Sequence, residues 1–152
     1  MQEESRHTNR VVHQARLLCE QARSDGLAGD GQPSPALAGA LEAGAVALAD
    51  KALAAAVVEF AGMEAPGESP WYPWLTQHQQ SNAELSRLYL ALTEGELAPL
   101  LTRVQATGEA SARPVPVHPG MIVSDAGSPR LDTLLDLFST LLTELREGAI
   151  EW

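Results

Sequence analysis

Residues 68–82, with the sequence ESPWYPWLTQHQQSN, hold the side chains whose types and spacing best fit chemistry. At 100° per residue along a helix, His78 and Asn82 fall on the apolar side, shortly after the aromatic residues Trp71 and Trp74. Aromatic side chains beside convergent polar groups are typical of small-molecule pockets. A histidine changes charge near neutral pH and can act as a general acid or base. The segment therefore predicts a ligand pocket in which His78 supplies acid–base chemistry or a hydrogen bond.

Two more residues complete the predicted ligand-binding set. Tyr89 lies on the same apolar stripe, and His118 lies in the proline-rich segment 113–123, RPVPVHPGMIV, which we expect to close over the pocket as a lid. The alternative is a core network of satisfied polar groups that fixes how the helix docks, because a single inward-facing histidine is more often structural than catalytic. The sequence leaves both interpretations open.

Glu59 is a second candidate for catalysis. It stands between two valines and a phenylalanine, which predicts that its carboxylate is buried. Buried carboxylates are candidates for acid–base catalysis. The alternative is a salt bridge to an arginine of the first or third helix, because buried charges are normally paired.

Three histidines, His7, His78 and His118, would offer imidazole ligands to a metal if the fold brought them together, and we expect His7 on the inner side of the first helix. However, the chain has no HxxxH or HExxH motif, and isolated histidines lack metal-ligand spacing. We therefore expect no metal and no other cofactor. The lack of GxSxG, Walker, GxGxxG and CxxC motifs argues against the common hydrolase, nucleotide-binding, dinucleotide-binding and zinc-ribbon classes.

Helices are the elements that would position these residues. Residues 36–62 are rich in alanine, the best helix former, and contain no proline. A helix that is apolar on nearly every side must be buried, so we expect this one at the centre. Ser-Pro pairs at Ser34, Ser69 and Ser128 predict three helix starts, because serine caps a helix and proline fits its first position.

The expected fold is an all-α bundle of four main helices plus one short helix, in a single domain of 152 residues. The main helices cover about 3–24, 36–62, 70–93 and 128–147, with the third starting somewhere between 70 and 74, and the short one covers 96–106. An apolar stripe marks the last helix, formed by Leu131, Leu134, Phe138, Leu141, Leu142 and Leu145. Residues 107–127 form a long proline-rich loop that is too apolar for a disordered linker, so we expect it to be ordered and to cross the bundle.

Net charge and composition exclude several partners. The chain carries a formal charge of −10, so we expect neither nucleic-acid binding, which depends on cationic contacts to phosphate, nor binding to anionic membranes. Asp50 and Lys51 interrupt the apolar run at its middle, which argues against a membrane span. The polar N-terminal sequence lacks the apolar region of a secretory signal. Cys19, a lone cysteine, is expected in the core. These features predict a cytoplasmic protein.

Two functional hypotheses follow from these residues. The first is a helical protein that binds a small molecule. Such a protein could be an enzyme that uses His78 for acid–base chemistry. The second is a non-catalytic interaction module, acting as a homodimer or as an acidic regulatory partner, because the alanine-rich surface of residues 36–62 permits close approach of a second chain. A lid formed by residues 113–123 would favour the first hypothesis, and an arm on the surface would favour the second.

Overall fold

The computed structural model of the protein describes residues 2–27, 35–110 and 129–150. The α-helices in these ranges are α1 (Gln2–Leu27), α2 (Pro35–Ala61), α3 (Trp71–His78), α4 (Ala83–Thr93), α5 (Ala98–Ala110) and α6 (Leu131–Ile150), and a 3-10 turn, η1, covers Gly62–Glu64. No strand occurs in the part of the chain that the structure describes. The predicted all-α class is therefore confirmed.

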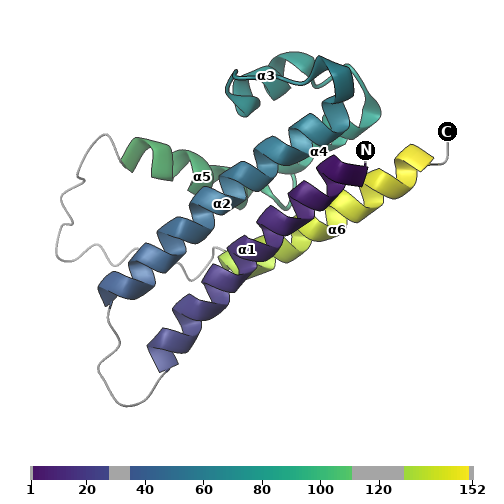
Figure 1. Ribbon diagram of the computed structural model, residues 1–152. Coiled ribbons are helices and arrows are strands. Elements are labelled where there is room, and N and C mark those ends of the chain that lie inside the picture. The colour runs from purple at the N-terminus through teal and green to yellow at the C-terminus, as the bar shows by residue number, and fades with distance from the viewer. Residues whose placement is uncertain (1, 28–34, 111–128, 151–152) are drawn as a thin grey trace.

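The two long helices α1 and α2 form an antiparallel pair that organises the molecule (Figure 1). α6 runs along α1, and its C-terminal end lies beside the N-terminal end of α1 (Figure 1). α5 packs against α2, while α3 and α4 lie near the C-terminal end of α2 (Figure 1). Residues that are far apart in the sequence therefore meet at both ends of the α1–α2 pair.

Small side chains let α1 and α2 approach closely. Ala15 of α1 and Ala45 and Ala52 of α2 are fully buried. A Cβ atom at Gly44 would lie 3.1 Å from Cδ1 of Leu18, which is tighter than an ordinary van der Waals contact. The alanine-rich composition of α2 thus sets the spacing of this helix pair.

Leucines from the remaining helices fill the rest of the core. The predicted stripe of α6 is confirmed, because Leu131, Leu134, Phe138, Leu142 and Leu145 are buried and Leu141 is partly buried against them. Phe138 is among the largest fully buried side chains. Each such side chain contributes about 1.5–3 kcal/mol when it leaves water.

The expectation that α2 is buried on every side is wrong. Leu37, Ala40, Ala47, Lys51 and Val58 of α2 are exposed. The neighbouring helices cover only one side of α2, so part of its apolar surface faces solvent. No helix within the described ranges is long and apolar enough to cross a membrane.

The helix predicted to continue to residue 93 is two helices, so the predicted count of four main helices plus one short helix differs from the structure. α3 ends at His78, and α4 begins at Ala83. Asn82 has an extended backbone with φ −153° and ψ 168°, and its Oδ1 accepts a hydrogen bond from the Leu85 amide at 2.7 Å. An asparagine in this position starts a new helix, because it satisfies an amide that lacks a helical partner.

The predicted helix boundaries are right to within a few residues. α2 begins at Pro35 as predicted, whereas α3 begins one residue after Pro70 and α6 begins two residues after Pro129. α5 continues to Ala110, so the loop predicted from residue 107 starts later. Ser34, Ser128 and the proline-rich segment 113–123 lie outside the described residues.

Candidate functional site

His78 is the last residue of α3 and is partly buried. Its ring stacks on Trp74 with centroids 4.2 Å apart and planes 8° from parallel. Its Nδ1 lies 2.8 Å from the carbonyl oxygen of Trp74, and because a carbonyl only accepts, Nδ1 must carry the proton of this hydrogen bond. In the neutral ring, Nε2 is then the acceptor. The acid–base role of His78 stays a prediction.

The other residues of the predicted pocket have different neighbours. Asn82 caps α4, and its Nδ2 also donates to the carbonyl oxygen of Phe60 at 2.9 Å, which ties α4 to the end of α2. Tyr89 packs partly buried against the core. The structure brings Trp74 and His78 together, but it directs Asn82 towards the backbone of α2.

Trp71 lines a separate hollow of about 320 Å³, which we call the aromatic hollow. The residues that line it include Asp50, Trp71, Tyr72, Leu101, Val104 and Gln105. The indole Nε1 of Trp71 donates to Oδ1 of Asp50 at 2.7 Å. Trp71 thus joins α3 to the middle of α2.

The three histidines considered as metal ligands do not share one site in the described part of the chain. His7 is exposed on α1, so the expectation that it faces inward is wrong. His118 lies outside the described residues. Over residues 2–27, 35–110 and 129–150, no group of three His, Cys, Asp or Glu side chains is arranged to hold a metal ion.

Glu59 is buried, as predicted, and forms an ion pair. Arg146 of α6 donates from Nε to Oε1 of Glu59 at 2.6 Å and from Nη2 to Oε2 at 3.0 Å. Arg146 also donates from Nη1 to Oδ1 of Asn9 at 3.0 Å. The alternative of a salt bridge therefore holds for Glu59, although its partner lies on the last helix and not on the first or third. This network joins α1, α2 and α6.

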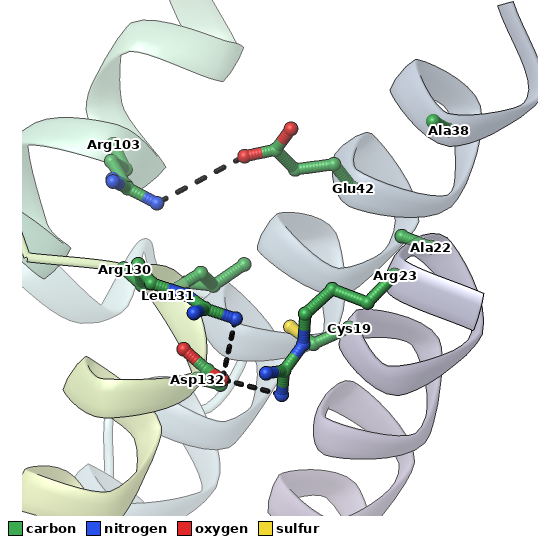
Figure 2. A pocket seen from close by; sticks show the side chains of 9 residues that line it. All are labelled: Cys19, Ala22, Arg23, Ala38, Glu42, Arg103, Arg130, Leu131 and Asp132. Atoms are coloured by element: carbon green, nitrogen blue, oxygen red, sulfur yellow. Dashed lines mark hydrogen bonds and ion pairs between the residues drawn. The ribbon is translucent and has the colours of Figure 1, made fainter. Parts of the chain in front are cut away.

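A hollow that the sequence did not reveal lies between α1, α2, α5 and the start of α6 (Figure 2). Its volume is about 350 Å³, and we call it the arginine hollow. The side chains that give it chemical character are Cys19, Arg23, Glu42, Arg103, Arg130 and Asp132. No motif marks these residues, because they come from four segments that are far apart in the sequence: α1, α2, α5 and the start of α6.

The charged groups of the arginine hollow form two sets (Figure 2). On one side, Oδ2 of Asp132 accepts from Arg23 at 2.6 Å and from Arg130 at 3.4 Å. On the other side, Nη1 of Arg103 lies 4.0 Å from Oε1 of Glu42. Among the described residues of this hollow, three guanidinium groups therefore face two carboxylates, which gives these groups a net positive charge.

Cys19 is the sulfur-bearing residue in the wall of this hollow. Burial raises the pKa of the Cys19 thiol above its ordinary value, and the carboxylates of Asp132 and Glu42 raise it further. Because the thiolate is the nucleophile, a raised pKa makes a cysteine less reactive. Cys19 therefore serves as a small packing residue at neutral pH, in line with the sequence interpretation.

The whole chain, residues 1–152, matches the model of DUF6586, a family of unknown function. The chain belongs to this family. No curated protein and no solved structure matches it. In this member of DUF6586, the structural features that bear on function are the two hollows and the Glu59 network.

Proposed function

We propose that the protein binds a small anionic molecule in the arginine hollow. The observation that carries the proposal is the convergence of Arg23, Arg103 and Arg130 from α1, α5 and the start of α6 on one cavity. Guanidinium groups present several N–H donors in a fixed plane, which suits carboxylate and phosphate oxygens. The volume of about 350 Å³ lies at the low end for ligand pockets, so the ligand is small.

Local charge supports an anion at this place. Arg23 and Arg130 share one carboxylate oxygen of Asp132, so this group of three carries a net positive charge. Both arginine side chains are largely exposed, and each keeps N–H groups that point to neither oxygen of Asp132. An anion that bridges them would relieve the repulsion between two neighbouring cations.

The test is calorimetric titration with inorganic phosphate, succinate and phenyl phosphate. Arg23→Gln and Arg130→Gln each remove one charge, and we expect each to weaken binding about tenfold to hundredfold, because a charge-assisted hydrogen bond contributes about 1.5–3 kcal/mol. Arg87→Gln is the matched control, since Arg87 is an exposed arginine that pairs with Glu144 between α4 and α6. Equal weakening by Arg87→Gln, or no binding of any of the three anions, would refute the proposal.

The open side of the α1–α2 pair favours a second function, self-association. Leu17, Leu37, Ala47 and Val58 are exposed there, and α1 and α2 border a groove of about 1080 Å³. A helix of 27 residues is about 40 Å long, and two adjacent helices are about 20 Å wide. This face offers roughly 800 Å², which is the area that each partner buries in a stable interface.

The occupant we propose for this face is a second copy of the chain. The groove is bordered by three basic side chains, Arg6, Arg10 and Lys51, and by two acidic ones, Glu3 and Glu4. The groove is therefore not acidic, unlike the chain as a whole, whose net charge of −10 makes two copies repel each other.

Light scattering during size-exclusion chromatography tests the homodimer. We expect a mass of twice the 16.2 kDa of one chain. Ala47→Glu places a charge on the face and should give monomers, whereas Ala83→Glu at the exposed start of α4 should leave the dimer intact. A monomeric mass for the unaltered protein at all concentrations would refute self-association.

A further inference from the structure

The aromatic hollow contains a carboxylate that has no cationic partner among the described residues. Asp50 is partly buried on α2, and its neighbour in the sequence, the exposed Lys51, borders the separate groove between α1 and α2. Its Oδ1 accepts the hydrogen bond of the Trp71 indole at 2.7 Å, and none of the described residues that line the hollow is an arginine, lysine or histidine. Charges that leave water are normally paired with an opposite charge. Within the part of the chain that the structure describes, the carboxylate of Asp50 therefore has no cation to pair with.

Two aromatic rings stand beside this carboxylate. Trp71 and Tyr72 have centroids 5.6 Å apart and planes 72° from parallel, so their faces point in different directions. Indole and phenol faces attract cations that lie within about 6 Å of the ring centre. Leu101 and Val104 of α5 add apolar side chains to the lining of the hollow. A carboxylate, aromatic faces and apolar side chains together match a cation that carries a hydrocarbon body.

We propose that the aromatic hollow binds a primary ammonium group attached to a small apolar body. The ammonium donates to the carboxylate of Asp50 and lies against the face of an aromatic ring, while the hydrocarbon part contacts Leu101 and Val104. A volume of about 320 Å³ limits the ligand to a small amine. The net charge of −10 raises the local concentration of cations around the whole molecule.

This inference does not depend on the proposed anion site. The two hollows share no lining residue among those that the structure describes, and arginines outnumber carboxylates in the first, whereas the charged group of the second is a carboxylate. If no ligand binds to one hollow, the proposal for the other hollow is unaffected. Substitution of Asp50 should weaken binding of the amine, and substitution of Arg23 should weaken binding of the anion.

Calorimetric titration with 2-phenylethylamine, which is protonated at pH 7, tests the amine site. The neutral 2-phenylethanol has the same body without the charge, and we expect it to bind at least tenfold more weakly to the unaltered protein. This comparison needs no substitution, so it is valid whether or not a variant folds.

The substitution Asp50→Asn separates charge from structure. Asparagine keeps an acceptor oxygen for the Trp71 indole but removes the negative charge, so we expect at least tenfold weaker binding of 2-phenylethylamine. The control is Asp136→Asn, which changes the net charge of the chain by the same amount at an exposed aspartate of α6. It should leave binding unchanged.

The substitution Tyr72→Leu removes one aromatic face and leaves the Asp50–Trp71 bond in place. We expect binding to fall about threefold to tenfold, as for the loss of one cation–π contact. The proposal is overturned by equal affinity for the amine and the alcohol, by equal affinity of the two aspartate variants, or by no binding of the amine up to about 10 mM.

Discussion

Replacing Arg146 with methionine tests the ion pair that joins α2 to α6. The carboxylate of Glu59 accepts two hydrogen bonds from Arg146, at 2.6 Å and 3.0 Å. The side chain of Glu59 is 5% exposed and that of Arg146 is 24% exposed. Methionine has a similar length but no charge, so Arg146→Met leaves a buried carboxylate without its partner.

The expected loss of stability follows from this burial. Removing one partner of a buried ion pair costs about 3–5 kcal/mol, because the remaining charge is neither solvated nor paired. The exposed pair between Arg87 and Glu144, whose side chains are 51% and 54% exposed, provides the comparison. Such surface pairs contribute about 0–1 kcal/mol. Arg146→Met should therefore destabilise the protein by several times as much as Arg87→Met.

Urea unfolding followed by far-ultraviolet circular dichroism measures both losses. The double variant Glu59→Leu with Arg146→Met replaces the pair by two apolar side chains, and it should regain most of the stability, since an apolar replacement of a buried pair is often neutral. If Arg146→Met costs no more than Arg87→Met, or if the double variant is no better than the single one, the interpretation of a buried, desolvated pair is wrong.

Three further outcomes are expected from the same structure. Gly39→Ala should stabilise the protein by about 0.5–1 kcal/mol in urea unfolding, because Gly39 lies within α2 and a Cβ there would meet nothing within 4 Å. Asn82→Ala should cost about 1–2 kcal/mol in the same assay, since it removes the cap of α4 and the bond to the Phe60 carbonyl. The pKa of the Cys19 thiol is raised in the folded state, so the protonated thiol stabilises the fold. This stabilisation is complete below the ordinary thiol pKa of about 8.5. The free energy of unfolding should fall as the pH rises from there through the pKa of the thiol in the folded protein. At pH 8 an aromatic disulfide reagent should accordingly react faster with Cys19 in urea than in the folded protein.

Each of these outcomes has a counterpart that would contradict it. Loss of stability in Gly39→Ala would mean that the open space at this position is filled by a partner. Full stability of Asn82→Ala would show that the break between α3 and α4 does not need the cap. Equal reaction rates of Cys19 in the folded and unfolded states would contradict its burial.

Much of the fold was readable from the sequence, because it depends on local preference and periodicity. The alanine-rich composition of residues 36–62 predicts α2, and the leucine stripe around Phe138 predicts α6. Both are properties of single segments. The other helices decide which side of α2 is covered. Because residues 36–62 are apolar on nearly every side, their sequence does not show which side that is.

The break at residues 79–82 shows how an apolar period can mislead. Leu75 and Leu85 are both buried, so the pattern continues across a position where the helix stops. A signal was present, because an asparagine followed by an acidic residue two positions later, here Asn82 and Glu84, is typical of a helix start. Projection onto one continuous helix placed Asn82 in a pocket, whereas it bonds to the backbone.

The candidate sites show the limit of sequence interpretation. Burial of Glu59 could be predicted from its apolar neighbours, but its partner Arg146 is 87 positions away and was missed. The arginine hollow combines residues from three helices and one helix start, and nothing in their spacing links them. Such sites depend on tertiary packing, which a linear pattern does not encode.

The attachment of α6 has a consequence for the synthesis of the protein. α6 is joined to α1 through the pairs Arg16–Asp136 and Arg23–Asp132, each at 2.6 Å, and it supplies Phe138 to the core. A nascent chain that has left the ribosome only as far as α5 holds both long helices but not the one that covers them. At about 5–20 residues per second, this interval lasts seconds. A ribosome that stalls before α6 therefore releases a fragment with an uncovered apolar side, which is a substrate for chaperones and proteases.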